Sequence, residues 1–452
     1  MDFEFGPWPK ALKSHRPKRF TIGHQLLSDV KRGGRCELFS LILELSDYES
    51  MSSSFRIEEA GRALPAQTTA VEVLKRGNRV MSLDVTRGLA VAGMILVVSA
   101  GSWDYRYAPL LHADWYGWTL ADMIFPLFLF TAGVALLFSC SVHLSRGISR
   151  RDLAWKILRR AATIFIMGLL LNALPSFDLK TLRIPGILQR IALCYASAGL
   201  LTLALWRAQD NGFRRMFASI SAVALTILLL YWAVLTFVPV PGFGPGRLDS
   251  LGSLATYIDR EVFGLSHLWP YGQTRGHGVT YDPEGILSTL PAIVSVLIGV
   301  LCGMWLRYDV GPFRRVVAMA GTGSALLITG LLLDPLVPIA KKLWTDSFVC
   351  FSGGFALLVF AAVYGLCDIL RLTKWSYVLR VFGANAILAF ALSQIMGAYS
   401  DQPWPLRKLG FAALNSLIPS APAASLTYAV LNLAILFAML APLYHRRIFL
   451  QI

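Results

Sequence analysis

The sequence predicts an all-α protein, a polytopic bundle of about ten membrane-spanning helices. Hydrophobic residues make up 55% of the 452 residues and charged residues only 15%, whereas a soluble protein carries about 25% charged residues. Apolar runs of roughly 20 residues recur along the chain, each long enough to cross ~30 Å of hydrocarbon. The Lys and Arg residues fall mainly between these runs, as membrane topology requires. The lipid bilayer is therefore the first partner that the sequence predicts.

Residues 1–78 differ from the rest of the chain. They are polar and mixed in charge, and their one apolar run, LFSLILEL (38–45), is too short to span a membrane. They lack the order of a signal peptide, in which a basic start precedes an apolar core and a small-residue cleavage site. We expect a poorly ordered cytoplasmic tail. Met81 stands just before the first span, so a later translation start fits the same pattern. Residues 79–452 form the expected transmembrane domain.

Ten spans are expected in this domain. They lie at about 82–100, 119–142, 153–174, 184–206, 215–238, 286–306, 315–336, 347–370, 376–398 and 425–445. The gaps after the even-numbered spans are short and rich in Arg, and the other gaps hold fewer positive charges per residue. The positive-inside rule therefore predicts that both termini are cytoplasmic. The gap after the first span and the longest gap, about 239–285, are then expected on the outer side.

The formal net charge of +15 does not indicate a nucleic-acid partner. Such binding needs basic residues clustered on one soluble surface, whereas here they alternate with the spans. The six cysteines form no CxxC pair and mostly lie inside apolar runs. We expect them to be small buried hydrophobes, with no disulfide framework and no metal site.

The first span opens with SLDVTRG (82–88). Asp84 and Arg87 are three residues apart, so they share a helical face and can form an ion pair. Such a pair can anchor a helix at the bilayer surface. Alternatively, Arg87 faces a cavity and binds a phosphate-bearing ligand, because ionisable groups within spans usually mark function.

The sharpest functional signal lies before the second span, in LLHADWYGWTLADMIFP (110–126). His112 stands in an aromatic loop, and an imidazole that is mostly neutral near pH 7 suits a general base. Asp122 lies about one turn inside the next helix, where it can orient His112 or cap the helix. Most of the aromatic residues fit an interfacial belt, and one or two of them, such as Trp115, can stack on a sugar ring.

Other polar residues interrupt the later spans. Gln189 and Arg190 fall in the outer half of the fourth span, where a charge is costly unless it is paired or solvated. YDPEG (281–285) gives the sixth span a helix start, with Asp282 and Glu284 near the positive end of the helix dipole. KKLWTDS (341–347) contributes Lys342. FGANA (382–386) embeds Asn385, which needs a partner inside the bundle.

In this order, SLDVTRGLAVAGMILV, GSW, LLHADWYGWTLADMIFPLFLFTAG, IPGILQRIALCY, YDPEGILSTLPAI, KKLWTDSF and FGANAI resemble the heparan-α-glucosaminide N-acetyltransferase family, which includes the lysosomal enzyme and many bacterial relatives. The resemblance covers roughly residues 79–452. SLDxxRG is also similar, more distantly, to the LDGLRG start of membrane acyltransferases that acetylate surface glycans.

The resemblance implies transfer of an acetyl group from cytoplasmic acetyl-CoA to the amine of a glucosamine across the membrane, with N- or O-acetylation of a sugar or glycan as the wider class. The family's active-site histidine, in HA-x-W-x-G-x-T-x-AD, falls on His112. The expected site then has three parts. The catalytic residues are His112, Asp122 and Ser99. Residues that hold the acetyl-CoA are Asp84, Arg87, Gln189 and Arg190. Residues on the acceptor side are Trp115, Asp282, Glu284, Lys342 and Asn385.

One departure from the family concerns the outer end of the first span. Relatives commonly carry Asn just before the PGSW-like turn, and here Val98 and Ser99 stand there. Loss of one oxyanion donor typically costs about 2.7–4 kcal/mol of transition-state stabilisation. We expect Ser99 to replace the carboxamide; otherwise the substrate or the activity differs from that of the relatives.

Two other functions compete with an acetyltransferase. A sugar or amino-sugar transporter should show Gly- or Pro-broken spans in repeated halves, a pattern that the sequence lacks. A non-catalytic relative that binds ligand without turnover would explain the missing Asn. The sequence leaves open the acceptor, direct transfer against an acetyl-histidine intermediate, and a homodimer. Compact loops and the lack of a signal peptide favour a bacterial inner (plasma) membrane.

Overall fold

The computed structural model describes residues 80–206, 210–308, 310–402 and 405–449. The expected N-terminal tail, 1–78, lies outside these residues. Within them the fold is an all-α polytopic bundle, as predicted, and eight helices are long and apolar enough to cross a membrane.

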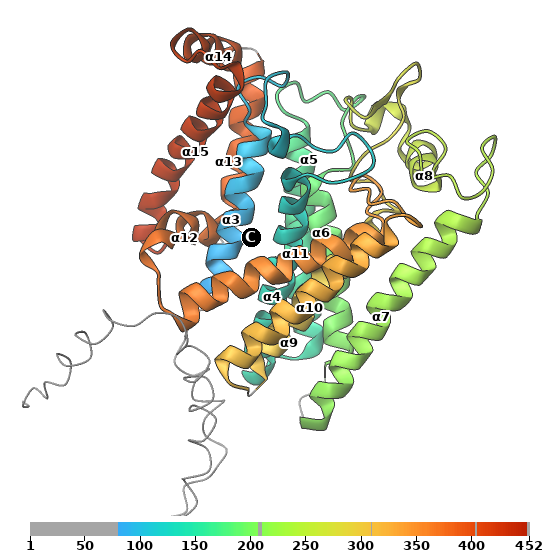
Figure 1. Cartoon of the computed structure of the whole chain (residues 1–452), viewed down its shortest axis with the longest axis vertical. Coiled ribbons are helices and arrows are strands. Elements are labelled where there is room, and N and C mark those ends of the chain that lie inside the picture. The colour runs from blue at the N-terminus through green and yellow to red at the C-terminus, as the bar shows by residue number, and fades with distance from the viewer. Residues whose placement is uncertain (1–79, 207–209, 309, 403–404, 450–452) are drawn as a thin grey trace, which may run out of the picture. The chain divides into compact units, whose positions relative to one another are not determined.

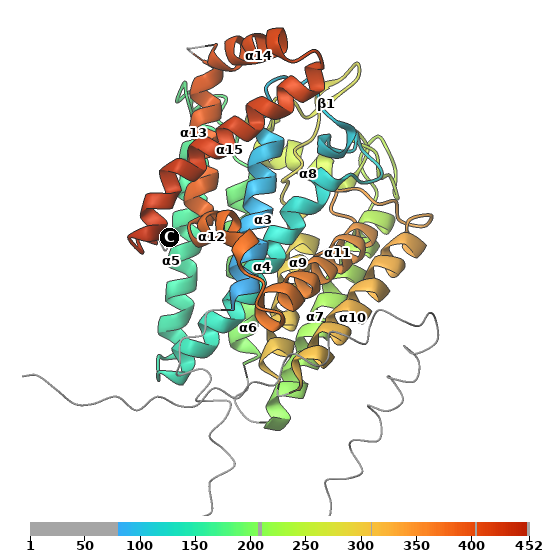
Figure 2. The same ribbon diagram turned by 60° about the vertical axis from the view of Figure 1, so that its left-hand side comes forward.

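The elements follow one another in the order shown in Figures 1 and 2. The helices are α3 (Met81–Val98), α4 (Leu120–Ser145), α5 (Arg150–Asn172), α6 (Ile187–Ala204), α7 (Asp210–Phe237), α8 (Leu254–Phe263), α9 (Thr289–Arg307), α10 (Pro312–Leu333), α11 (Asp346–Tyr364), α12 (Tyr377–Ala384), α13 (Ala386–Asp401), α14 (Leu406–Leu417) and α15 (Ala421–His445). Short turns η2 (Ala108–Leu110), η3 (Leu265–His267), η4 (Gly365–Ile369) and η5 (Lys374–Ser376) and an antiparallel pair, β1 (Gln273–Thr274) with β2 (Gly278–Val279), complete the described chain.

Each of the ten expected spans coincides with helix in the structure. Eight expected spans coincide with the eight apolar helices, and the one at 376–398 is a bent pair, Lys374–Ala384 and Ala386–Asp401, that turns by 75°. The expected span at 153–174 coincides with α5, which is not among the eight. Its first half carries Lys156, Arg159 and Arg160, all exposed. These charges, and not the length of α5, keep it out of the eight.

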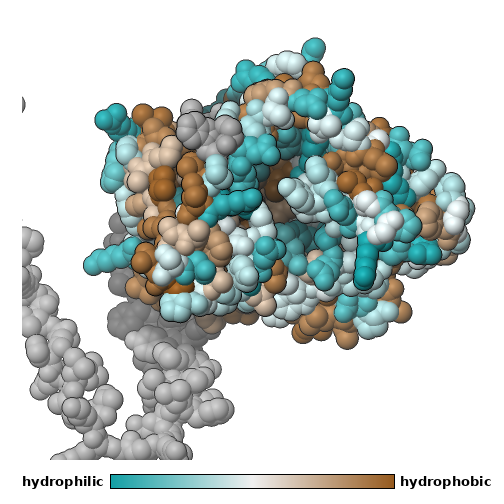
Figure 3. Space-filling view, turned by 90° about the horizontal axis from the view of Figure 1, so that it is seen from above, coloured by the Kyte–Doolittle hydropathy of each residue, from teal (hydrophilic) through white to brown (hydrophobic). Residues whose placement is uncertain are grey.

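The long helices run between two ends of the bundle (Figures 1 and 2). The end where α3 finishes and α4 begins carries His112, and we call it the His112 end. The opposite end, where α3 begins, is the Arg87 end. The His112 end also gathers α8, the β1–β2 hairpin and α14 (Figure 1). Seen from this end, the surface mixes hydrophilic and hydrophobic side chains and is hollowed near its centre (Figure 3).

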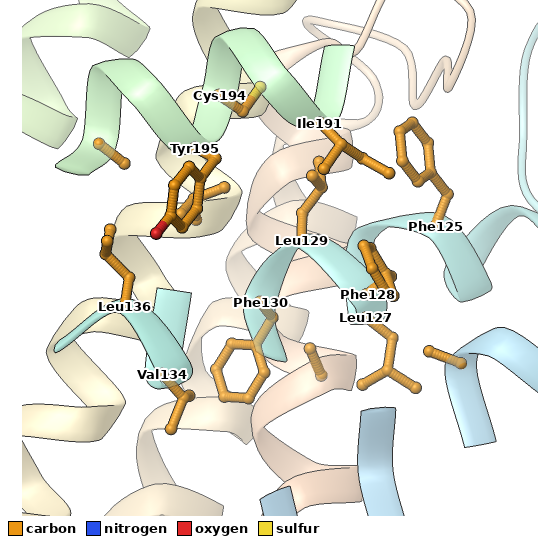
Figure 4. Close-up of a cluster of buried hydrophobic side chains, with 14 of the residues drawn as sticks. Phe125, Leu127, Phe128, Leu129, Phe130, Val134, Leu136, Ile191, Cys194 and Tyr195 are labelled. Carbon is orange, nitrogen blue, oxygen red and sulfur yellow. The ribbon is translucent and has the colours of Figure 1, made fainter. Parts of the chain in front are cut away.

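The core forms around α4, whose apolar side chains point to several neighbouring helices. Phe125 and Leu129 of α4 lie near Ile191 of α6, and Leu136 lies near Tyr195 (Figure 4). The face of α9 toward α4 carries small residues. A Cβ added at Gly133 of α4 would overlap the backbone carbonyl of Val296 in α9. Small residues allow such close helix crossings in membrane proteins. Helix α4 is thereby fixed between α6 and α9, and the loop that leads into it ends on a rigid helix.

A second close crossing joins α3 to α12. A Cβ added at Gly88 would overlap the carbonyl of Leu379, and one added at Gly383 would overlap the carbonyl of Asp84. The described cysteines are free, and all but Cys350 are buried, in agreement with the prediction of small buried hydrophobes: Cys140, Cys194, Cys302 and Cys367.

Candidate active site

His112 and Asp122 form a hydrogen-bonded dyad at the start of α4. Thr119 precedes the helix in an extended conformation, and its backbone N–H donates to Asp122 Oδ2 at 3.0 Å. The N–H of Ala113 donates to the same oxygen at 3.1 Å. The other oxygen, Oδ1, lies 2.8 Å from His112 Nδ1. Asp122 is 1% exposed, so its carboxylate is fixed by the helix start and in turn fixes the imidazole.

This pairing decides which nitrogen of His112 is reactive. A carboxylate only accepts hydrogen bonds, so Nδ1 carries the proton and Nε2 is left as the basic nitrogen. Of the His112 side chain, 42% is exposed. Burial of the rest lowers the pKa of His112 below its usual 6.5, the positive charge of Lys341 lowers it further, and Asp122 opposes both. The net direction is downward, which keeps the imidazole neutral and basic near pH 7.

Lys341 is the third member of this cluster. Its ammonium lies 3.3 Å from Asp122 Oδ1 and 3.1 Å from His112 Nδ1. Because Nδ1 already donates to Asp122, the ammonium pairs with the carboxylate. Burial lowers the pKa of Lys341, while Asp122 and Glu284 raise it. The 339–345 turn that carries Lys341 is joined to the His112 loop by a hydrogen bond from Gly117 N–H to the carbonyl of Ile339, at 2.7 Å.

Lys342 and Trp115 lie together beside this dyad. The Lys342 ammonium donates to the carbonyl of Asp114 and, at 3.0 Å, to the hydroxyl of Tyr281. It also lies over the rings of Trp115 and Tyr281, 5.6 and 5.1 Å from their centroids. The Trp115 indole donates to the carbonyl of Leu248 at 2.8 Å. Lys342 therefore contacts the loop that carries both His112 and Trp115, and the Trp115 ring is already packed against protein.

Asp282 and Glu284 are held by Arg183, which the sequence analysis did not single out. The guanidinium binds Asp282 through two bonds, of 2.8 and 2.6 Å, and Glu284 at 2.5 Å. Burial lowers the pKa of Arg183, but the two carboxylates outweigh it and raise the pKa overall. Neither carboxylate starts the helix as expected, because α9 begins at Thr289. The charge of Glu284 still acts on His112 and Lys341.

Arg190 and Gln189 lie in the first turn of α6, at the His112 end, and not beside Asp84 and Arg87. Arg190 is 1% exposed; it donates to the carbonyl of Gly285 at 3.1 Å and to the hydroxyl of Ser288, and it lies 5.1 Å from the Trp344 ring centroid. Its Nε and Nη1 are buried without a partner among the described residues, as are both amide atoms of Gln189. Buried polar atoms are normally hydrogen-bonded, so such exceptions indicate water or a ligand.

Asp84 and Arg87 pair as predicted, at 2.8 Å, and Arg87 Nε also donates to the carbonyl of Gly383 at 2.6 Å. Asn385 was expected on the acceptor side. It lies instead at the break between α12 and α13, and its amide donates to the carbonyl of Ile448 at 3.1 Å. Its position follows from the helix break, which the sequence motif did not show.

Ser99 was expected to act beside His112. The structure places it at the C-terminal cap of α3, in a cleft lined by α13, α14 and α15. The prediction carried Ser99 over from the position of the relatives' Asn, and the sequence did not show that the end of α3 faces α13, α14 and α15. Among the described residues no three His, Cys, Asp or Glu side chains gather as metal ligands.

Sequence reasoning missed three residues of this region: Lys341, Arg183 and Asp259. The last lies in α8, where burial raises its pKa to about 7, and its Oδ1 accepts the backbone N–H of Ile286 at 2.8 Å. A signal existed for the two basic residues. Both lie in gaps expected on the outer side, where the positive-inside rule makes Lys and Arg less common.

Known proteins resemble the chain over most of the described bundle. Residues 79–333 match the family model described as "Heparan-alpha-glucosaminide N-acetyltransferase, catalytic". The chain belongs to the heparan-alpha-glucosaminide N-acetyltransferase family. It is 31% identical over 370 residues to heparan-alpha-glucosaminide N-acetyltransferase of Mus musculus and 30% identical to that of Homo sapiens. Each comparison covers 73% of this chain and 55% of the relative, so the chain spans about half the length of the curated relatives it matches.

The heparan-alpha-glucosaminide N-acetyltransferase family is one of transmembrane acetyltransferases, and the eight apolar helices of the described residues support an integral membrane protein. The matched region contains His112, Asp122, Arg183 and Arg190. Lys341 comes later in the chain, so its contact with the dyad is an observation of the structure alone.

Proposed function

We propose that this protein transfers an acetyl group from acetyl-CoA, bound from the Arg87 end, to the amine or hydroxyl of a sugar or glycan at the His112 end. One observation carries the proposal: a neutral imidazole whose Nδ1 is fixed by the buried Asp122 and whose Nε2 is left basic. This dyad lies at the His112 end of the helix bundle, in a chain that belongs to an acetyltransferase family.

The chemistry of the acceptor step follows from Nε2. The amine nitrogen bonds to the thioester carbonyl carbon, the bond from that carbon to sulfur breaks, and the amine proton passes to Nε2. The CoA thiolate leaves and takes a proton. Asp122 stabilises the imidazolium that forms, as the aspartate of a catalytic triad does. In the two-step variant, Nε2 itself takes the acetyl group before the amine does. Both routes need an unprotonated ring.

Arg190 is the proposed donor to the thioester oxygen. A developing oxyanion needs donors that are already oriented in a site without bulk water. Arg190 meets this need because two of its nitrogens are buried and unpartnered among the described residues, while the third is anchored to the segment that follows Glu284. It would take the role expected of Ser99, which lies in a separate cleft.

At the other end, Arg87 is proposed to attract the phosphates of the donor. Its side chain is 22% exposed, and its guanidinium is oriented by Asp84 and by the carbonyl of Gly383. With the Arg-rich gaps in the cytoplasm, the Arg87 end faces inward and both termini are cytoplasmic. The extended pantetheine arm of CoA would cover much of the ~30 Å of hydrocarbon between the two ends. We propose the bacterial inner membrane as the location.

The test uses the purified full-length protein with radiolabelled acetyl-CoA and a panel of amino sugars. The His112→Ala variant should bind acetyl-CoA and lose transfer by about 10²–10⁴-fold, the usual range for a missing general base, or more if Nε2 carries the acetyl group. His277→Ala, which removes an exposed histidine from the hairpin at the same end, is the matched control. A folded His112→Ala variant that transfers acetyl at the parental rate would refute the assignment. Sugar uptake into vesicles without acetylation would indicate a transporter.

The donor end is tested separately by equilibrium binding of acetyl-CoA. Arg87→Ala should weaken binding about tenfold, because a charge-assisted bond to phosphate is lost. Arg151→Ala, at an exposed arginine of the same end, should change it less than twofold. Equal binding by Arg87→Ala and the parent would leave the Asp84–Arg87 pair with a structural role only.

A further inference from the structure

A single peptide group, the one that joins Gly285 to Ile286, lies between the side chains of Asp259 in α8 and Arg190 in α6. Its N–H, on Ile286, donates to Asp259 Oδ1 at 2.8 Å. Its carbonyl, on Gly285, accepts a hydrogen bond from Arg190 Nη2 at 3.1 Å. This peptide is trans, so its N–H and C=O point in opposite directions. Asp259 and Arg190 therefore hold the same peptide group from opposite sides.

Gly285 permits this arrangement because it has no side chain. A Cβ added there would overlap Asp259 Oδ2, so any other residue would push the carboxyl group away from the peptide. Asp259 is 2% exposed, and the contact is therefore shielded from water. Hydrogen bonds in such surroundings are stronger than in water, and bonds in a chain polarise one another. The bond from the N–H of Ile286 thus makes the carbonyl of Gly285 a better acceptor for Arg190.

The orientation of Arg190 depends on this carbonyl. Among the described residues, the guanidinium donates to the carbonyl of Gly285 and to the hydroxyl of Ser288. The Ser288 hydroxyl in turn donates to the same carbonyl at 3.2 Å. Both hydrogen bonds of Arg190 therefore lead to one oxygen atom, and the direction of its unpartnered Nε and Nη1 follows from where that atom lies.

Asp259 can hold the peptide group with or without its proton. Burial raises the pKa of Asp259 to about 7, although the bond from the N–H of Ile286 lowers it. Both forms of the carboxyl group are therefore present near neutral pH, and each has an oxygen that accepts an N–H. Asparagine offers the same acceptor. The contribution of Asp259 is thus the hydrogen bond, and a permanent negative charge is not needed for it.

We propose that Asp259 is a positioning residue, which orients Arg190 toward the reacting thioester through the peptide group of Gly285 and Ile286. The inference rests on the proposed function, in which Arg190 donates to the thioester oxygen. Asp259 itself contacts neither substrate in this scheme. If its role were only structural, it would connect α8 to the segment before α9 and would affect stability without a specific effect on Arg190.

The test measures kcat and the KM for acetyl-CoA in the purified full-length protein, with glucosamine as acceptor. Asp259→Ala should lower kcat at least tenfold and up to about 10²-fold, the cost of a misplacement by ~1 Å. KM should change less than twofold, because the affected interaction belongs to the transition state. In an Arg190→Gln background, Asp259→Ala should change kcat less than threefold, because the group that it orients is absent.

Two further variants separate the hydrogen bond from other effects. Asp259→Asn keeps the acceptor oxygen and should retain kcat within threefold of the parent. Asp249→Ala is the matched control, because the carboxylate that it removes also accepts backbone N–H groups, those of Leu251 and Gly252, in the same outer segment. It should retain kcat within twofold.

Gly285→Ala disturbs the same contact from the other side and gives a second test if Asp259→Ala does not fold. Its Cβ would displace the carboxyl group, so kcat should fall as it does in Asp259→Ala. Because both changes break one hydrogen bond, the double variant should lose no more activity than either single variant. Acetyl-CoA binding with the parental Kd shows that each variant is folded.

Three results would overturn the proposal: parental kcat in folded Asp259→Ala, the same fall in kcat from Asp259→Ala with and without Arg190, or equal falls in Asp259→Asn and Asp259→Ala. The proposed function fails in a different way, if the parent transfers no acetyl group. The cycle is then read from the midpoint of thermal unfolding. A destabilisation by Asp259→Ala that shrinks in the Arg190→Gln background would keep the link between the two residues, and equal destabilisation would remove it.

Discussion

Replacing Asp122 by Asn should move the ring proton of His112 from Nδ1 to Nε2 without changing the shape of the site. The Asp122 Oδ2 atom accepts backbone N–H groups from Ala113 and Thr119, so the single oxygen of Asn is needed there. The amide NH₂ group then faces His112 Nδ1, 2.8 Å away. Because NH₂ can only donate, Nδ1 must accept and the ring proton moves to Nε2. The basic nitrogen is lost while both residues stay in place.

The expected loss of activity is large and the loss of stability moderate. The same Asp→Asn change in a Ser-His-Asp triad lowers kcat about 10⁴-fold, and we expect a fall of about 10³–10⁴-fold in Asp122→Asn. Lys341 loses its charged partner at 3.3 Å. Breaking a buried pair costs about 3–5 kcal/mol. We expect less, up to ~3 kcal/mol, because burial lowers the pKa of Lys341 and so already disfavours its charged form.

The assay is the initial rate of acetyl transfer at saturating acetyl-CoA, with donor binding measured in parallel. The control is Asp152→Asn, which changes an exposed aspartate in the first turn of α5 that also pairs with its N-cap residue, Ser149. It should keep activity within twofold of the parent. An Asp122→Asn variant that binds acetyl-CoA and retains kcat within tenfold of the parent would show that Asp122 does not set the tautomer of His112.

Other predictions concern pH, packing and charge. The transfer rate should fall as pH drops, with a midpoint below 6.5, because the pKa of His112 is lowered and the protonated ring is inactive; a midpoint above 6.5 in a pH–rate profile would contradict this. Gly133→Ala should lower the yield of folded protein in size-exclusion chromatography, since its Cβ meets the α9 backbone, whereas Gly321→Ala, with open space around it, should not; equal yields would refute the close crossing. Arg183→Gln should destabilise the protein by about 3–5 kcal/mol in thermal or chemical unfolding, because two buried carboxylates lose their partner. Arg247→Gln, at an exposed ion pair, should have little effect. Similar losses of stability in the two variants would argue against a special role for the buried cluster of Arg183, Asp282 and Glu284.

The sequence was most informative where function and local structure coincide. The His112–Asp122 dyad could be expected because Asp122 sits one turn inside an apolar run, where it both starts the helix and reaches back to the loop. Lys341 begins the KKLWTDSF motif, but its contact with the dyad could not be predicted, because it depends on how the turn between α10 and α11 packs against the His112 loop. Ser99 was expected in the site as a replacement for the Asn of the relatives, and its surroundings depend on the packing of α13, α14 and α15, which no local motif shows.

A similar limit applies to the fold. Apolar length located the helices well but said nothing about which residues face lipid. In α5, basic residues such as Arg159 lie on the exposed side, whereas Leu153 and Ile157 are buried. Asn385 was correctly expected to need a partner. The 75° turn beside it, which decides what that partner is, depends on how α12 packs against α3.

The close crossings at Gly133 and Gly88 have a consequence for how material crosses this membrane. Helices whose backbones touch have no side-chain layer between them that could slide or re-interdigitate, so α3, α4, α9 and α12 form a stationary frame. A carrier that alternately exposes one site to each side needs its halves to rock against each other. Under the proposed function, the frame can stay still while the acetyl group alone travels. Turnover should then be governed by bond-making and by the arrival and departure of substrates at two fixed openings, and cross-linking α4 to α9 should leave it intact.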